Sequence, residues 1–173
     1  MTARSGATVP MLLLLLVVSC ALPKLALAQP IGPDAAVRDA LAWSPEYRQA
    51  ADWISTGLVG AAVVLPCTID RHWKCVGREA LAVGAAYLTA EILKRLVHRE
   101  RPNGADAKSF LSMHTSIACA AVLSAKHKRE LWSLCPSVAY TRIAADWHYF
   151  TDVAAGAGQA AAWSGLVVIV LRW

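Results

Sequence analysis

The sequence is poor in charged residues and has no useful length of the alternating apolar and polar pattern that marks a β-strand. Charged side chains make up 17% of the 173 residues and hydrophobic ones 57%, a balance that excludes intrinsic disorder. The chain also lacks internal repeats and low-complexity tracts, which excludes repeat and collagen-like architectures. What remains are Ala-rich apolar segments separated by short polar stretches, and these predict an all-α fold.

Two kinds of binding site are also missing from the pattern. The net charge of +5 comes from 17 Lys and Arg against 12 Asp and Glu without a long basic run, so we expect no nucleic-acid partner. Neither a Cys-x2-Cys nor a His-Glu-x2-His motif occurs, and the His residues are interleaved with cations that would repel a metal ion. We therefore expect no bound metal.

The beginning of the chain has the composition of an export signal. Arg4 precedes the apolar run 11–18, and Ala26-Leu27-Ala28 supplies small residues at the two positions that a signal peptidase reads. We predict a signal peptide over 1–28 and one mature domain over 29–173, exported and periplasmic, or membrane-associated and facing the periplasm. An uncleaved anchor helix is an alternative, although the apolar run is shorter than the ~20 residues that span a bilayer.

The cysteines fit an exported protein. A third interpretation of the leader makes Cys20 the lipidated residue of a lipobox. Cleavage after Ala28 leaves four cysteines, an even number that suits an oxidising compartment. We favour the pairs Cys67 with Cys75 and Cys119 with Cys135, because each pair flanks a short polar connection; four buried free thiols are the alternative.

The apolar segments predict a compact bundle of about five to six helices. Our boundaries are 34–42, 46–66, 77–98, 114–126, 131–146 and 149–172, with loops over 66–74 and 99–108. Segment 114–126 is too short to cross a membrane, whereas 153–171 is long enough. We favour a bundle that is soluble or rests on a membrane surface over an integral membrane bundle. The seven Trp residues suit a membrane interface or ordinary packing.

Three short constellations carry chemistry. The first is Lys94-x6-Arg101-Pro102, two cations where an apolar helix runs into a polar loop. The second, 109–115, contains Ser112 and His114 at a predicted helix start, where unpaired backbone N–H groups can bind an anion. Each also has a structural interpretation, since cations suit a helix C-terminus and Ser is a common N-cap.

The third constellation is Thr141-Arg142-x5-His148-x3-Asp152. The i, i+4 spacing of His148 and Asp152 would place both side chains on one face of a helix, where the carboxylate can hold one imidazole nitrogen. The other nitrogen would then be free to attack a substrate. A buried histidine that is merely satisfied by a neighbouring carboxylate is the structural alternative.

In this order, the three constellations resemble the type 2 phosphatidic acid phosphatase superfamily, which also contains bacterial class A acid phosphatases and vanadium haloperoxidases. The family pattern is K-x6-RP, PSGH and SR-x5-H-x3-D, and the resemblance covers Lys94 to about Gly158. It implies the helical core of that superfamily and phosphate-ester hydrolysis without a cofactor, with vanadate as an inhibitor or phosphate mimic.

The resemblance also implies a role for each matching position. Phosphate would be bound by Lys94, Arg101, Arg142, the Ser112 hydroxyl and the Met113 backbone. His148 would form a phosphohistidine, Asp152 would orient it, and His114 would protonate the leaving group. Substrates would be phosphorylated lipids or small phosphomonoesters, including pyrophosphates, at a membrane surface.

The sequence departs from the family pattern at Leu111, Met113 and Thr141, which replace Pro, Gly and Ser. A side chain at Met113 would crowd the phosphate if that backbone needed a positive φ, whereas an ordinary helical conformation would still present its N–H. We expect an active phosphatase. The alternatives are a vanadium-dependent haloperoxidase-like enzyme and a catalytically weakened phospholipid-binding member.

Overall fold

The protein is an all-α bundle in the part of the chain that this computed structural model describes, residues 30, 32–125 and 128–171. The leader, Cys20 and Trp173 lie outside these residues. The helices are α3 (Pro33–Leu41), the 3-10 helix η1 (Pro45–Tyr47), α4 (Arg48–Asp70), α5 (Trp73–Leu96), α6 (Met113–Ser124), α7 (Lys128–Leu131), α8 (Leu134–Ala144) and α9 (Phe150–Leu171). All six predicted helices are present, and the short α7 is an addition.

The predicted loop over 66–74 is wrong. Helix α4 continues through Pro66 to Asp70, and only Arg71 and His72 separate it from α5. Proline keeps a helical φ and loses one backbone hydrogen bond, a cost that tertiary packing can offset, and Pro66 is buried. Arg71 ends the helix in the left-handed conformation, at φ 51°.

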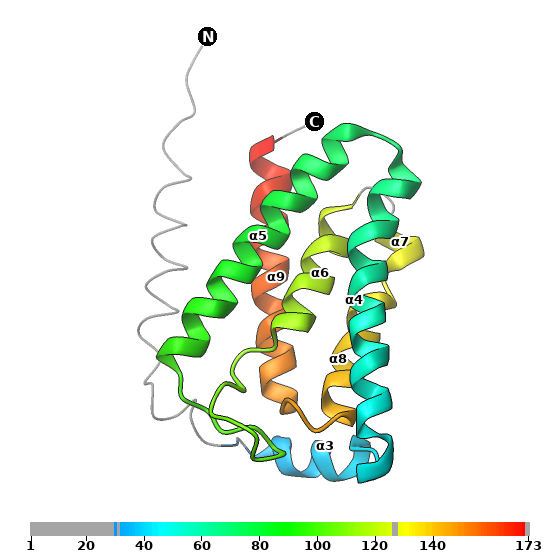
Figure 1. Ribbon diagram of the computed structural model, residues 1–173. Helices are drawn as coiled ribbons and strands as arrows, with labels where there is room; N and C mark the ends of the chain where they lie inside the picture. Colours follow the sequence, from blue (N-terminus) through cyan, green and yellow to red (C-terminus); the bar gives the residue numbers. More distant parts are fainter. Residues whose placement is uncertain (1–29, 31, 126–127, 172–173) are drawn as a thin grey trace.

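Helix α6 lies at the centre of the bundle (Figure 1). It packs against α4, α5, α8 and α9, and eight of its twelve residues are buried. Its side chains are mostly small, as in Ala118, Cys119, Ala120 and Ala121, which are fully buried. Small side chains allow neighbouring helices to approach closely, so α6 can be surrounded on all sides.

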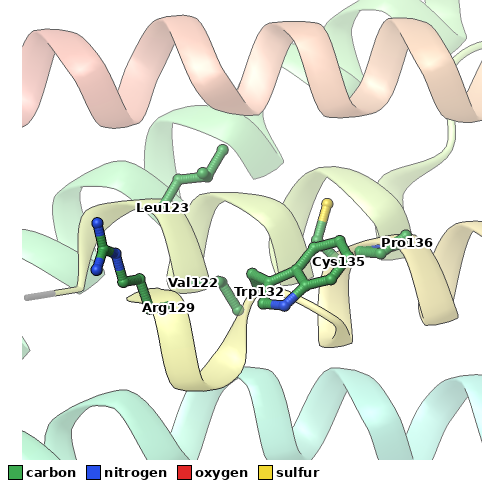
Figure 2. Close-up of a pocket in the computed structure, with 6 residues that line it drawn as sticks. All are labelled: Val122, Leu123, Arg129, Trp132, Cys135 and Pro136. Atoms are coloured by element: carbon green, nitrogen blue, oxygen red, sulfur yellow. The ribbon is translucent and has the colours of Figure 1, made fainter. Parts of the chain in front are cut away.

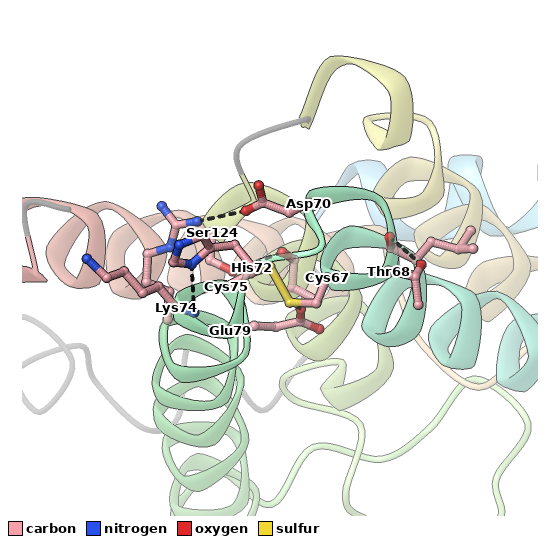
Figure 3. The surroundings of a disulfide bond; sticks show 11 residues. Cys67, Thr68, Asp70, His72, Lys74, Cys75, Glu79 and Ser124 are labelled. Carbon is pink, nitrogen blue, oxygen red and sulfur yellow. Dashed lines mark hydrogen bonds and ion pairs between the residues drawn. A yellow bond between two sulfur atoms is a disulfide. The ribbon is translucent and has the colours of Figure 1, made fainter.

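Two disulfides hold the bundle, and both have the favoured pairing. Cys67 is bonded to Cys75 across the connection from α4 to α5 (Figure 3), and Cys119 is bonded to Cys135 between α6 and α8. The alternative of four free thiols is wrong. The carboxyl group of Glu79 lies beside the first pair, but sulfurs that are bonded to each other are not thiolate ligands for a metal ion.

The two ends of the bundle carry different connections (Figure 1). The α4–α5 connection lies at one end. The long connection 97–112 and helix α3 lie at the other end, together with the end of α5, the start of α6, the end of α8 and the start of α9. Every residue proposed above for phosphate chemistry belongs to this second end, which we call the site end.

Candidate active site

The site end assembles the predicted residues from five segments of the chain. Helix α5 supplies Lys94 in its last turn, and the connection that follows supplies Arg101. The remaining residues lie at helix ends: Ser112, Met113 and His114 at the start of α6, Arg142 at the end of α8, His148 just before α9 and Asp152 in the first turn of α9.

His148 is buried and held through one ring nitrogen. Its Nδ1 lies 2.7 Å from the backbone oxygen of Ser109 and 3.8 Å from the Asp152 carboxylate. A carbonyl oxygen can only accept, so Nδ1 carries the proton and Nε2 keeps its lone pair. The Ser109 carbonyl accepts this hydrogen bond, and the Asp152 carboxylate that the sequence placed beside the ring lies within ion-pair distance of the same nitrogen.

Asp152 also fixes the backbone around His148. Its Oδ2 accepts hydrogen bonds from the Ser109 hydroxyl at 2.5 Å and from the Tyr149 backbone N–H at 2.9 Å. These contacts tie together the two segments that flank the imidazole, the one that supplies its acceptor and the one that carries it. Asp152 thus positions His148 through Ser109.

A buried arginine that sequence reasoning missed extends this network. The Arg99 guanidinium lies between two fully buried carboxylates, 2.5 Å from Asp152 Oδ1 and 2.5 Å from Asp34 Oδ2. Arg99 Nη1 also donates to the Thr151 hydroxyl at 2.7 Å, and Asp34 accepts from the Thr151 backbone N–H. Buried charges are stable only when they are paired, as these are.

The turn before His148 is fixed by a second group of ion pairs. Asp146 has a positive φ of 59° and is fully buried. Its carboxylate accepts from Arg38 of α3 at 2.6 and 2.9 Å and lies 3.1 Å from Arg48 of α4. A non-glycine residue keeps this conformation only where its surroundings hold it, and here they do so two residues before the imidazole.

Two of the predicted phosphate-binding cations share one aromatic ring. The guanidinium of Arg101 lies 4.8 Å from the centroid of Trp147, and that of Arg142 lies 5.5 Å from it. Arg101 also donates to Asp106, at 2.6 Å, and to the Trp147 backbone oxygen, at 3.3 Å. The indole next to His148 therefore brings two cations from distant segments to one place.

Arg142 is buried and only partly neutralised. Its Nη1 donates to the carboxylate of Asp52, while its Nε has no hydrogen-bond partner among the described residues. Asp52 and Trp147 also line a pocket of about 250 Å³ with Arg48, Gln49, Asn103 and Ala145. A buried donor without a partner is costly unless a ligand or water completes it, so this arrangement favours an anion.

Lys94 also belongs to this charged group. Its Nζ donates to the backbone oxygen of Lys108 at 2.8 Å. Burial, together with the positive charges of Arg101 and Arg142, lowers the pKa of Lys94 to about 8. Cations that depress one another's proton affinity create a site where a bound anion is strongly stabilised.

The start of α6 confirms Ser112 as an N-cap. Its hydroxyl oxygen accepts from the Thr115 hydroxyl at 3.0 Å and from the Thr115 backbone N–H at 3.5 Å. This contact leaves the Ser112 hydroxyl hydrogen for another acceptor. Met113 is the first helical residue, without a positive φ, and its side chain packs against the cluster that contains Phe110 and Leu111.

Helix α9 lies so close to the start of α6 that position 156 of α9 must be glycine. A Cβ atom at Gly156 would lie 2.8 Å from the Ser112 backbone oxygen and 3.0 Å from the Ser116 hydroxyl. Ser116 in turn donates to the Ser112 oxygen at 3.0 Å. The close approach brings the first turn of α9, with Asp152, against the first turn of α6.

Both histidines of the site are neutral near pH 7. Burial lowers the pKa of His148 to about 3, an effect that Asp152 opposes and that Lys94 and Arg142 strengthen. Burial, together with the positive charge of Arg142, lowers the pKa of His114 to about 4. The same cations act on both imidazoles, which places the two rings in one electrostatic environment.

Comparisons with known proteins bear on the fold. No protein-family profile matches the chain, and no curated protein matches it by sequence. Among solved structures, the crystal structure of Aquifex aeolicus LpxE superposes on it with a TM-score of 0.64 at 19% identity, over 83% of this chain and 97% of that one. At this identity the likeness shows the fold alone: the chain has the helical fold of that protein, which confirms the predicted all-α core.

A larger pocket than the one beside Arg142 belongs to another region. It lies between α6, α7 and α8 (Figure 2), has a volume of about 710 Å³, and is lined by Val122, Leu123, Arg129, Trp132, Cys135 and Pro136. None of the predicted site residues lines it. Size alone does not mark the chemical site in this fold, because the phosphate group that the site end would hold is small.

Proposed function

We propose that this protein is a metal-independent phosphatase that hydrolyses phosphate monoesters or pyrophosphates of lipids through a phosphohistidine at His148. The observation that carries the proposal is the contact between His148 Nδ1 and the Ser109 backbone oxygen at 2.7 Å. It fixes the tautomer in which Nε2 is a nucleophile, and it does so among buried cations.

The cations supply the electrostatic part of the mechanism. A phosphate monoester carries nearly two negative charges and spreads charge over its equatorial oxygens during transfer. Lys94, Arg101 and Arg142 would bind those oxygens, together with the Ser112 hydroxyl and the backbone N–H of Met113. Each charge-assisted hydrogen bond is worth ~1.5–3 kcal/mol, so several of them lower the barrier without a metal ion.

The first chemical step forms a phosphohistidine. The lone pair of His148 Nε2 attacks phosphorus while the bond between phosphorus and the leaving-group oxygen breaks. That oxygen takes a proton from His114, which requires His114 to be protonated in the substrate complex. The bound phosphate favours this, since its negative charge opposes the cations that lower the pKa of His114.

The second step returns the enzyme to its starting state. Neutral His114 accepts a proton from water as the water oxygen attacks phosphorus. The bond between phosphorus and Nε2 breaks, inorganic phosphate is released, and His148 regains its lone pair. Throughout, the Ser109 carbonyl holds Nδ1–H and stabilises the positive charge on the ring.

A lipid substrate is supported by the surface next to the site. Asp52, which pairs with Arg142, is followed in α4 by Trp53 and Ile54, which are exposed. A phosphate bound at Arg142 would therefore have apolar protein surface within reach of its organic part. The two disulfides support export to an oxidising compartment.

The test is phosphate release by purified protein from a panel of lipid and soluble phosphates, with and without EDTA. His148→Ala is expected to lower the rate at least about 10³-fold. His98→Ala removes an exposed histidine just after α5 and serves as the matched control, with an unchanged rate. Activity is expected to survive EDTA and to be inhibited by vanadate.

Retention of activity in His148→Ala, or its loss on chelation, would contradict the proposal. A covalent phosphate on His148, trapped with a ³²P-labelled substrate and stable to alkali, would distinguish an enzyme from a phospholipid-binding protein. Peroxide-dependent halide oxidation by the vanadate-loaded protein would instead favour a haloperoxidase.

A further inference from the structure

Three helices of the bundle turn large apolar side chains outward along their middle. More than half of each side chain is exposed at Val64 on α4, at Leu81 and Leu88 on α5, and at Ile169 and Val170 on α9. We call the segments 53–69 of α4, 80–90 of α5 and 153–171 of α9 the apolar belt. Single exposed apolar residues are ordinary on soluble proteins, but a belt shared by three helices is not.

The belt is free of charge, and on two of its three helices, α4 and α9, the uncharged length matches a bilayer. Helix α4 has no Asp, Glu, Lys or Arg between Asp52 and Asp70, and α9 has none from Val153 to Leu171. At 1.5 Å per residue these segments extend over about 26 and 28 Å, close to the ~30 Å hydrocarbon core of a membrane. Charged residues return at both ends of the bundle.

The apolar windows of these helices are not core. Only 17% of the residues in the most apolar 18-residue window of α4 are buried, and 28% in that of α9. The central helix of a soluble protein has such side chains inside. Here the small residues of α6 occupy the inside and the large apolar residues lie outside, an arrangement typical of helices that pack within lipid.

Several polar side chains at the depth of the belt bond within the protein, although the buried Ser55 hydroxyl has no partner among the described residues. Thr56 and Thr89 donate their hydroxyl hydrogens to backbone oxygens one turn earlier in their own helices. Gln159 donates to the Ala86 oxygen, and the Trp163 indole donates to Thr89. Water would satisfy these groups on a soluble surface, whereas in hydrocarbon each needs a partner inside the protein.

We infer that the apolar belt is a lipid-facing surface and that the bundle spans a bilayer, with the site end at one membrane surface and the α4–α5 connection at the other. This inference favours the integral membrane bundle, the alternative that the sequence left open, over a soluble or surface-bound bundle. It rests on burial, charge and hydrogen bonding in the belt, so it holds or fails independently of the phosphatase chemistry.

Depth-dependent fluorescence quenching on the full chain in phosphatidylcholine liposomes tests this directly. The variant Leu88→Cys carries an environment-sensitive fluorophore in the belt, and Asn103→Cys carries the same fluorophore at the exposed site end as the matched control. Both variants are made in a Cys20→Ser background, because the other four cysteines are paired in disulfides and the label then goes to the introduced thiol, which mass spectrometry of the labelled peptide confirms.

The expected result is strong quenching at position 88 by lipids that carry bromine in mid-chain, with little quenching by iodide in water. Position 103 should show the reverse. Quenching of position 88 by iodide, comparable with that at position 103, would overturn the inference. So would protection from both quenchers together with crosslinking between copies at position 88, since a second chain would then cover the belt. An anchor confined to the leader cannot imitate the expected pattern, because the probe reports on α5 itself.

Discussion

The site end and the apolar belt distribute polarity in opposite ways. At the site end, charged and polar groups such as Asp34, Arg99, Asp152 and His148 are buried, whereas in the belt large apolar side chains such as Leu88 are exposed. Paired charges are buried in proteins of every kind, whereas apolar surface exposed along three helices is unusual for a soluble protein. The difference indicates that the buried charged and polar side chains of this fold are concentrated at one end. There, paired charges can fix the position of a nucleophile.

The contrast has a physical reason. Small side chains fill the centre of the bundle, so large apolar residues have no room inside and face outward. The connections of the site end are longer, and they bring carboxylates and guanidinium groups together at hydrogen-bond distance. Rigid helices thus provide the frame, and loops and helix ends provide the chemistry.

The largest expected effect concerns the two sides of the belt. If the belt lies in hydrocarbon, Asn103→Cys and Arg71→Cys should react with a membrane-impermeant maleimide from opposite sides of a sealed vesicle. Both positions are exposed, one at the site end and one in the α4–α5 connection. Labelling before and after lysis of the vesicles checks this. Reaction of both cysteines from the same side would contradict a belt that lies in hydrocarbon.

The second prediction tests the buried charges of the site end. Asp34→Asn removes one of the two carboxylates that hold Arg99, so Arg99 should pull on Asp152 and displace His148. We expect kcat to fall about 10- to 100-fold, with little change in KM, because the loss acts on the nucleophile's position. Steady-state kinetics on the lipid phosphate that is hydrolysed fastest measures kcat and KM separately.

Asp39→Asn is the matched control for this experiment. It changes an exposed carboxylate of the same helix and should leave kcat unaltered. Circular dichroism would show whether Asp34→Asn is folded. A folded variant with unchanged kcat would show that Arg99 serves packing alone.

The third prediction concerns pH. An unfolded histidine binds a proton below pH ~6.5, whereas burial lowers the pKa of folded His148 to about 3. Between these values the unfolded state holds more protons, so the folded state loses stability as pH falls from 6.5 toward 3 and regains it as pH rises. The loss is of the order of a few kcal/mol.

Thermal unfolding in detergent at pH 7 and pH 4.5 measures this effect. His148→Asn keeps a donor for the Ser109 carbonyl but does not titrate, so it should reduce the difference between the two unfolding temperatures. His98→Asn, which changes an exposed histidine, should not. An equal difference in all three proteins would mean that His148 is not the group responsible.

The smallest expected effect comes from the exposed edge of the site. Asp52 binds Arg142 in the empty site and competes with phosphate for it. A partly exposed ion pair is worth ~0.2–1 kcal/mol, so Asp52→Asn should strengthen inhibition by inorganic phosphate up to about fivefold. Inhibition constants for wild type, Asp52→Asn and Asp39→Asn would decide, and weaker inhibition in Asp52→Asn would assign the carboxylate a direct binding role.

Spacing along the chain predicted the elements but not all their ends. The six helices follow from apolar segments, yet α4 passes through Pro66 because packing outweighs one lost hydrogen bond. The exact partner of His148 also escaped prediction. Spacing pointed to Asp152, whereas the turn brings the Ser109 carbonyl closer, and no side-chain identity encodes a backbone contact.

The ion pair between Asp34 and Arg99 is a second contact that the sequence did not predict. They are 65 residues apart, and nothing local in the sequence distinguishes them from exposed charges. Their burial follows from where α3 docks. Arg99 does lie between Lys94 and Arg101, so its neighbourhood was evident, but its role as a bridge between carboxylates was not.

The sequence by itself determined the helical class and the spaced positions of the candidate site, because helix periodicity and short spacings act over a few residues. It favoured the disulfide pairs without deciding them. The tertiary structure alone decided which faces of the helices are outside and which charges are paired. Those outcomes depend on contacts between segments far apart in the chain. Whether a given side chain is buried or exposed is set by how all the helices pack together.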